Sequence, residues 1–292
     1  MSEPRALNAA LLAQFPLPCH ADDADKEDRG RALFIAGSRE VSGAALLAGT
    51  AALRAGAGKL QIATGDSVAP GLGLAMPEAR VIAFAEEEGG CVDPQAIGKL
   101  VATCDGVDSL TIGPGMQHGD GLRKLVSTIL ATRGGYPLIL DAAVLGDLPA
   151  LADALREWPG GSILLPHAGE MARLLECEVE AVKDDPLAAA RQAAERYRAV
   201  VVVKGEWSFV AAPDGQAFAY HGGGVGLATS GSGDTLAGIV GGLAARGADP
   251  LTALLWGVYL HGEAGRILSE EVGRIGFLAR EIPDLIPRLM QA

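Results

Sequence analysis

Short runs of apolar residues recur along the chain and alternate with segments of helical apolar spacing. The runs cover residues 31–36, 59–64, 80–84, 110–112, 137–140, 162–165 and 199–203. They are nearly continuous in apolar residues, as strands buried on both faces are. Helical spacing follows several of them, at residues 43–55, 121–131 and 171–175. This alternation predicts an α/β fold with a mostly parallel central sheet flanked by helices.

The two ends of the chain have patterns of their own. Residues 1–29 are mixed and predict an irregular N-terminal extension with a short helix around 7–14. Near the other end, segments 208–212 and 216–220 flank Asp214-Gly215 and predict a hairpin. Helices are then predicted at 234–246, 250–269 and 278–290. We find no internal repeat or linker, so the chain is predicted to form a single domain, residues 1–292.

Polar residues follow several of the predicted strands. Asp141, His167 and Lys204 come directly at or after the ends of three apolar runs, and Gly113-Pro114-Gly115 follows another. In open α/β sheets the carboxyl ends of the strands form the edge that binds ligands. These residues are therefore predicted to share a ligand site.

The stretch Thr229-Ser230-Gly231-Ser232-Gly233-Asp234 precedes an apolar segment with helical spacing. Small residues at the start of a helix allow backbone N–H groups to converge on an anion, so Gly231, Ser232 and Gly233 form a candidate anion hole. A carboxylate repels phosphate unless it acts on the other reactant, and Asp234 is a candidate general base toward an attacking hydroxyl. The alternative is an ordinary loop whose acid stabilises the helix dipole.

Each other candidate also has a simpler interpretation. His167 can be satisfied by neighbouring backbone, Glu170 can favour a helix N-terminus, and Lys204 can be a solvated strand end. Ala44 can serve helix–sheet packing alone. The remaining histidines are interpreted as structural or exposed: His20, His118, His221 and His261.

Known phosphate-binding and hydrolase motifs do not fit. The chain lacks GxxxxGK[ST], and neither Gly113-Pro114-Gly115 nor Gly231-Ser232-Gly233 completes GxGxxG. GxSxG is also incomplete around Ser232. These absences argue against a P-loop enzyme, an ordinary dinucleotide fold and a serine hydrolase.

Composition narrows the choice of partners. The 292 residues are 49% hydrophobic and carry a formal net charge of −12, which argues against a nucleic-acid partner. The four cysteines are far apart, so they predict neither a zinc site nor a disulfide framework, and no side chain is nominated as a metal ligand. We see no signal-peptide core or membrane span, and therefore expect a cytoplasmic protein.

Several stretches together resemble one known family. They are Gly37-Ser38 with Gly43-Ala44-Ala45, Leu53-Arg54-Ala55-Gly56-Ala57-Gly58, Met76-Pro77-Glu78, Ile112-Gly113-Pro114-Gly115, Leu165-Pro166-His167-Ala168-Gly169-Glu170-Met171, Val203-Lys204-Gly205, Ala211-Ala212-Pro213-Asp214-Gly215 and residues 226–238. In this order, from about residue 25 to 265, the set resembles the ADP- or ATP-dependent NAD(P)H-hydrate dehydratases of the ribokinase-like superfamily. The motifs are weak singly and specific as a set.

The resemblance implies a repair enzyme that returns the S form of hydrated NADH or NADPH to the working cofactor. ADP or ATP would phosphorylate the ring hydroxyl, with Asp234 as the base and Mg²⁺ assisting, and phosphate would then be eliminated. By similarity, the hydrate site contains Ala44, Gly115, His167 and Asp234. The nucleotide site, again by similarity, contains Lys204, Gly205, Glu206, Trp207, Ser208 and Gly233.

The chain departs from the family pattern in places. Asp141-Ala142-Ala143 lacks the second acid of Asp-Ala-Asp, Ala168 replaces a usual proline, and Gly224-Val225 stands where Asn-Pro is common. The epimerase domain of many relatives is not expected here, so a separate epimerase would act on the same metabolite. Relatives form tetramers or larger assemblies, which implies a homo-oligomer.

Two other functions remain open from the sequence. One is a ribokinase-like small-molecule kinase for a substrate such as a vitamin precursor, which would use the same base and anion hole. The other is a nucleotide-binding protein without turnover. The choice between ADP and ATP, and between the NADH and NADPH hydrates, is also left open.

Overall fold

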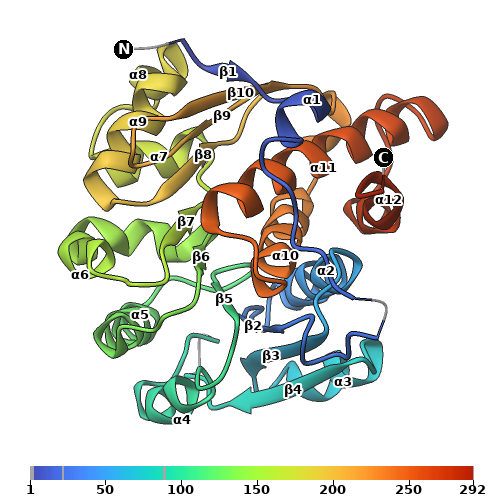
Figure 1. Ribbon diagram of the computed structural model, residues 1–292. Coiled ribbons are helices and arrows are strands. Elements are labelled where there is room, and N and C mark those ends of the chain that lie inside the picture. Colours follow the sequence, from blue (N-terminus) through green and yellow to red (C-terminus); the bar gives the residue numbers. More distant parts are fainter. Residues whose placement is uncertain (1–2, 22, 88–89, 292) are drawn as a thin grey trace.

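The computed structural model describes residues 3–21, 23–87 and 90–291, and its strands form one ten-stranded sheet (Figure 1). The strand order from edge to edge is β1-β10-β9-β8-β7-β6-β5-β2-β3-β4. β9 is antiparallel to β8 and β10, and the other neighbouring pairs are parallel. The strands are β1 (Arg5–Ala6), β2 (Arg31–Ile35), β3 (Lys59–Gly65), β4 (Ala79–Phe84), β5 (Ser109–Ile112), β6 (Leu138–Leu140), β7 (Ser162–Leu164), β8 (Val200–Val203), β9 (Trp207–Ala211) and β10 (Ala217–His221). The predicted mostly parallel α/β sheet is confirmed.

Helices cover both faces of this sheet. In Figure 1, α4 to α9 lie on one side and α2, α10, α11 and α12 on the other. The α-helices are α1 (Ala9–Leu12), α2 (Ser42–Arg54), α3 (Ala69–Ala75), α4 (Ile97–Ala102), α5 (Asp120–Thr132), α6 (Ala152–Arg156), α7 (Ala168–Leu175), α8 (Val179–Asp184), α9 (Pro186–Tyr197), α10 (Ser232–Ala245), α11 (Pro250–Glu271) and α12 (Ile282–Leu289). Coverage on both sides explains why all four valines of β8 are buried and why the central strands are continuous apolar runs.

The chain reverses its direction of travel across the sheet at β2. After β2 it adds β3 and β4 on one side, and it then returns to place β5 against the opposite edge of β2. The segments after β2 and β5 meet there, since Gly37 N–H donates to the carbonyl oxygen of Pro114 at 2.7 Å. Such a switch point opens a crevice at the carboxyl ends of parallel strands. The fold therefore places the glycine turns after β2 and β5 at the edge suited to ligands.

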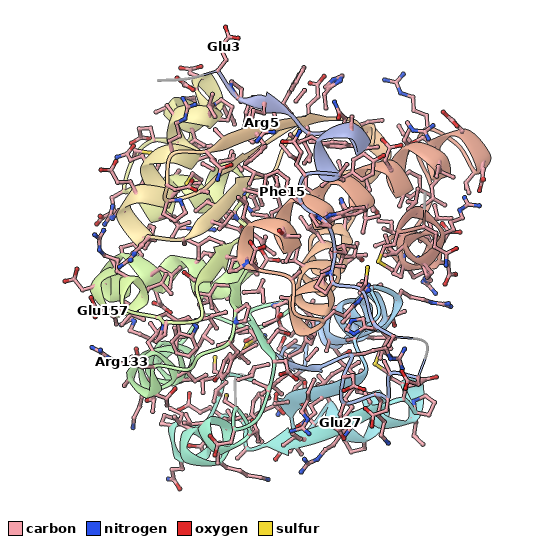
Figure 2. All side chains as sticks on the ribbon, in the orientation of Figure 1. Glu3, Arg5, Phe15, Glu27, Arg133 and Glu157 are labelled. Carbon is pink, nitrogen blue, oxygen red and sulfur yellow. The ribbon has the colours of Figure 1, made fainter. Side chains whose placement is uncertain are left out.

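The N-terminal extension is more ordered than the sequence predicted. β1 pairs in parallel with β10, and Asn8 caps α1 by accepting a hydrogen bond from Leu11 N–H at 2.9 Å. The Arg5 guanidinium lies over the rings of Phe15 and Phe218, and Figure 2 shows Arg5 and Phe15 at this edge. The predicted short helix around 7–14 is present as α1, whereas the prediction of an otherwise irregular segment is wrong for β1, because pairing with β10 lies beyond local sequence signals. Residues 1, 2 and 22 lie outside the described part.

Some helices differ from the predicted ones. The predicted helix 278–290 is divided into a 3₁₀ turn, η4 (Ala279–Glu281), and α12, and α10 begins at Ser232 rather than at residue 234. The sequence did not predict α3, α4, α6, α8 and α9, or the 3₁₀ segments η1 (Pro94–Ala96), η2 (Ala142–Leu151) and η3 (Val225–Leu227). A signal for α9 was present, because Asp185 caps it and Pro186 opens it. Among the described residues, no helix has the length and apolar character needed to cross a membrane.

Candidate functional site

The N-terminus of α10 presents unpaired backbone donors. Gly231 caps the helix in the left-handed conformation, with φ of 88°, and offers no side chain to satisfy the first turn. Ser232 N–H donates to the carbonyl oxygen of Thr229 at 3.2 Å. Within the described residues, the N–H groups of Gly233 and Asp234 have no such acceptor. The predicted anion hole is corrected at Ser232, whose amide is already used; among the described residues, the amides of Gly231, Gly233 and Asp234 have no backbone acceptor.

The carboxyl group of Asp234 has an unusual environment in this first turn. The side chain is half-buried. Burial raises the pKa of Asp234 to about 6, and the neighbouring carboxyl group of Asp141 adds to the rise while the ammonium of Lys204 opposes it. A carboxylate of this basicity is ionised at pH 7 and accepts a proton more readily than an ordinary aspartate.

Lys204 lies among three carboxyl groups. Its Nζ donates to Asp141 Oδ1 at 2.9 Å and lies 4.0 Å from Glu170 Oε2. Burial alone would lower the pKa of Lys204, but attraction to Asp141, Glu170 and Asp234 holds it above its ordinary value. Burial raises the pKa of Asp141, although Lys204 partly offsets this. The lysine stays charged in a cluster with an excess of acid.

The ammonium group of Lys204 also faces the start of α10. A Cβ placed on Gly233 would lie 3.6 Å from Lys204 Nζ. Ala142, which follows the lysine's partner Asp141, has a positive φ of 55°, a conformation that costs an alanine roughly 1–2 kcal/mol. The strained residue thus adjoins the ion pair. A cation and the free N–H groups converge on one region, as binding of a phosphoryl group requires.

His167 caps the helix that follows β7. Its Nδ1 accepts hydrogen bonds from the N–H groups of Gly169 at 3.0 Å and Glu170 at 3.3 Å, and Glu170 Oε2 accepts from His167 N–H at 2.8 Å. The backbone contacts considered as the simpler interpretation of His167 are therefore present. Because Nδ1 is an acceptor, a neutral ring carries its proton on Nε2, which lies 3.5 Å from Glu170 Oε1. The His167 ring is half exposed, and its Nε2–H donor lies near the sheet edge formed by the carboxyl ends of the strands.

Gly115 and Ala44 lie against each other at the switch point. A Cβ added to Gly115, whose φ is 66°, would come within 2.5 Å of the Ala44 Cβ and 2.6 Å of the Val41 carbonyl oxygen. The turn after β5 therefore touches the start of α2 with no room for a side chain. Small residues at both positions leave backbone, rather than side chains, at this part of the rim.

A cavity of about 980 Å³ lies on one side of Lys204. Four of the predicted nucleotide residues line it: Lys204, Gly205, Glu206 and Trp207. The indole of Trp207 is half exposed and stacks on the His221 ring, with 4.4 Å between the ring centroids. Ser208 and Gly233 do not line this cavity, and neither do the predicted hydrate residues Ala44, Gly115, His167 and Asp234.

One contact in this region was not predicted. His261, interpreted from the sequence as structural or exposed, lies on α11 with its Nε2 3.0 Å from Ser232 Oγ and 3.1 Å from the Ser232 carbonyl oxygen. Nothing in the local sequence signals this contact, because it depends on how α10 and α11 pack. Asp141, in contrast, was predicted to lie at the shared ligand edge but without a specific role, and Glu170 was interpreted only as favouring a helix N-terminus.

Residues 32–288 match the family model described as NAD(P)H-hydrate dehydratase. A protein of Xanthomonas campestris named ADP-dependent (S)-NAD(P)H-hydrate dehydratase is 47% identical over 289 residues, covering 98% of this chain and 96% of the relative. The chain belongs to the NAD(P)H-hydrate dehydratase family.

Other members of this family differ in length and in bound molecules. A bifunctional NAD(P)H-hydrate repair enzyme of Thermofilum pendens is 36% identical over 95% of this chain, and the chain spans about half of that relative's length. The structure of a Bacillus subtilis ADP/ATP-dependent NAD(P)H-hydrate dehydratase, co-crystallised with ATP/Mg²⁺, is similar to this one, with a TM-score of 0.85 and 30% sequence identity. The match covers 100% of this chain and 99% of the Bacillus subtilis chain. The ribokinase-like fold prediction is confirmed, since a solved ribokinase-like superfamily protein also shares it.

Proposed function

We propose that this NAD(P)H-hydrate dehydratase family member converts the S form of NAD(P)H-hydrate to NAD(P)H with ADP or ATP as phosphoryl donor. The observation that carries the proposal is the placement of Asp234, whose raised pKa suits a base, beside free N–H donors and the Lys204 ammonium. The family match and the 47% identical relative named as an ADP-dependent dehydratase support it.

The reaction begins at the hydroxyl group of the hydrated ring. Asp234 removes its proton while the oxygen forms a bond to the terminal phosphorus of the nucleotide, and the bond from that phosphorus to the nucleotide oxygen breaks. The N–H groups of Gly233 and Asp234 donate to the charged oxygens of the transferring group. Lys204 adds a positive charge on the same side, so the developing charge meets a preorganised environment.

Elimination follows from the chemistry of the phosphorylated ring. The ring-nitrogen lone pair expels phosphate by forming a carbon–nitrogen double bond, and loss of a proton from the adjacent ring carbon restores the dihydropyridine. No further nucleotide is consumed in this step. The products are NAD(P)H, inorganic phosphate and a nucleotide shortened by one phosphoryl group.

The proposed binding sites follow the two sides of the α10 N-terminus. The nucleotide occupies the cavity lined by Lys204, Gly205, Glu206 and Trp207, and Ser208 follows in the same segment. The phosphates of the nucleotide reach Gly233. The stacked Trp207 and His221 rings offer an aromatic surface there. The hydrate ring lies at the switch point beside Ala44, Gly115 and His167, where small residues allow a flat ring to approach the backbone.

Mg²⁺ fits this arrangement as a companion of the nucleotide. Among the described residues, no group of three or more His, Cys, Asp or Glu side chains could hold a metal ion by itself. Mg²⁺ usually keeps several waters and binds through phosphate oxygens with one or two carboxylates. Asp141 and Asp234 are the carboxylates available here, and the ion would neutralise phosphate charge.

One assay tests the proposal against its alternatives. The purified chain is mixed with the S form of hydrated NADH or NADPH, Mg²⁺ and either ADP or ATP, and the return of nicotinamide absorbance is followed. Recovery of absorbance with release of phosphate is the expected result. A stable phosphorylated product would indicate a kinase, and nucleotide binding without turnover would indicate a binding protein; either outcome contradicts the proposal.

Three further aspects remain proposals. A separate epimerase acts on the same metabolite, the chain forms homo-tetramers, and it works in the cytoplasm. The four cysteines are free, which suits a reducing compartment, and exposed apolar side chains at Val272, Ile275 and Leu278 are available for subunit contacts. Light scattering of the purified protein measures the subunit number.

A further inference from the structure

A half-buried histidine contacts the turn at the start of α10. Nε2 of His261, on α11, lies 3.0 Å from Ser232 Oγ and 3.1 Å from the Ser232 carbonyl oxygen. Ser232 is the first residue of α10 and is itself buried. The two free N–H groups follow it immediately along the chain. The imidazole therefore holds the residue from which the donors of Gly233 and Asp234 project.

The contact fixes the chemical form of the ring. A carbonyl oxygen can only accept a hydrogen bond, so Nε2 must carry the proton that reaches Ser232. Burial lowers the pKa of His261 to about 4, with the charge of Lys204 acting in the same sense and the Ser232 contact opposing both. A second positive charge at this helix N-terminus would also oppose the helix dipole. The ring is a neutral Nε2–H donor at neutral pH.

The two sides of the turn have different tasks. Lys204 Nζ approaches the side on which a Cβ of Gly233 would lie, and it can meet phosphate directly. His261 reaches Ser232, whose own N–H already donates to the Thr229 carbonyl oxygen. The histidine thus acts through the backbone rather than on the reactants.

We propose that His261 is a positioning residue, whose Nε2–H anchors Ser232 so that the N–H groups of Gly233 and Asp234 are aligned on the transferring phosphoryl group. This inference rests on the proposed dehydratase function. Misalignment of retained donors affects the transition state more than the bound nucleotide. Loss of the anchor therefore lowers kcat and leaves the KM for the nucleotide nearly unchanged.

The test uses two substitutions of the histidine and one matched control. His261→Leu removes the donor at similar volume, and His261→Gln keeps an N–H donor at about the distance of Nε2. His118→Gln makes the same exchange at an exposed histidine. We expect His261→Leu to lose about tenfold or more in kcat, with less than about threefold change in KM for ADP. His261→Gln is expected to recover most of the loss, and His118→Gln to match the unmodified chain.

Ser232 provides an independent check. Once His261→Leu has broken the contact, adding Ser232→Ala should cause little further loss in kcat, because the two residues act as one unit. Additive losses would contradict the proposal. So would an unchanged kcat in His261→Leu, or failure of His261→Gln to recover kcat when its melting temperature matches that of the unmodified chain.

Two readouts keep this test separate from the proposed function. Long-range ¹H–¹⁵N spectra of the unmodified chain at pH 6 should contain the signals of a neutral Nε2–H histidine that are absent in His261→Gln. A protonated or Nδ1–H form would overturn the inference even if turnover is normal. Absence of turnover in the unmodified chain, with the expected tautomer present, would instead contradict the dehydratase proposal.

Discussion

At the scale of single residues, the balance of charge around Asp234 determines how it can react. The carboxyl groups of Asp141, Glu170 and Asp234 surround one ammonium group, that of Lys204. A single positive charge therefore cannot balance all three when they are ionised. Burial raises the pKa of Asp234 to about 6, and the neighbouring Asp141 adds to the rise while Lys204 opposes it. The raised pKa of Asp234 makes both the activity and the stability of the protein depend on pH.

Activity is expected to depend on one deprotonation near pH 6. Below this pH the carboxyl group of Asp234 is protonated and cannot accept the hydroxyl proton, so kcat/KM should rise between pH 5 and 7 and then level off. Asp234→Asn should abolish the return of nicotinamide absorbance while ADP binding, measured by calorimetry, stays largely intact. Unchanged turnover in this variant would exclude Asp234 as the base.

The same substitution is expected to stabilise the fold at pH 8. The folded-state pKa of Asp234 is raised, so the ionised form opposes folding above pH 6, and this cost disappears as the pH falls below the unfolded value near 4. Discounted for partial exposure, Asp234→Asn should gain about 1–2 kcal/mol at pH 8 and nothing at pH 4. Denaturant unfolding at both pH values measures this, with exposed Asp153→Asn as the control. A gain of equal size at pH 4 would contradict the explanation.

Lys204 is expected to matter for folding as well as for the nucleotide. Lys204→Met leaves the buried carboxyl group of Asp141 without its 2.9 Å partner and should cost about 2–3 kcal/mol in unfolding free energy. Adding Asp141→Asn removes the uncompensated charge and should restore part of that stability. ADP affinity should remain weak in both variants, because the cation is missing. If the double variant were less stable than Lys204→Met, the uncompensated charge of Asp141 would not explain the loss of stability.

At the scale of elements, the glycine turn after β5 and the start of α2 form one close contact. Gly115→Ala would force a Cβ against Ala44 and the Val41 carbonyl, in a left-handed conformation that itself costs roughly 1–2 kcal/mol. We expect a lower melting temperature and a higher KM for the hydrate. Gly98→Ala in α4 is the control, because its added Cβ has nothing within 4 Å, and it should be neutral or slightly stabilising. Equal melting temperatures for the two variants would contradict this contact.

At the start of α10, the sequence predicted the helix but not the contacts of its first residue. The small residues and the acid predicted a helix start with free donors, and the structure has them. The sequence did not reveal that Ser232 N–H turns back to Thr229 or that Ser232 also meets α11. These contacts depend on the angle at which the chain enters the helix and on a helix that follows it.

At the scale of the whole molecule, the two edges of the sheet are formed by different kinds of strand. β4 ends one side, while β1 covers β10 on the other, where Glu3, Pro4 and Ala6 also line the large cavity. A segment far from the site in sequence thus forms a wall of the proposed nucleotide pocket. An uncovered β10 would be a free sheet edge.

Removal of residues 1–8 is therefore expected to weaken nucleotide binding. The truncated chain loses the strand that pairs with β10 and the Arg5 contact with the Phe15 and Phe218 rings, so its melting temperature should fall by a few degrees. Its Kd for ADP should rise several-fold as the cavity opens. Circular dichroism controls for loss of fold, and an unchanged Kd would show that this wall does not contact the nucleotide.

The segments that become buried strands, and the polar residues that end them, follow from the amino-acid sequence alone. Periodicity and strand-end position are local properties, so Asp141, His167 and Lys204 could be assigned to one rim and Asp234 to a helix start before any coordinates. The motifs along the chain are weak singly, but as a set they were specific enough to indicate the family.

The pairings between residues far apart in the sequence are fixed by the packing of the folded chain. The ion pair of Lys204 with Asp141, the contact of His261 with Ser232 and the pairing of β1 with β10 join residues 63, 29 and more than 200 positions apart. Their geometry depends on how helices and strands pack, and a change of an ångström makes or breaks each one. The raised pKa of Asp234 belongs to the same class, because burial and neighbouring charge exist only once the chain has folded.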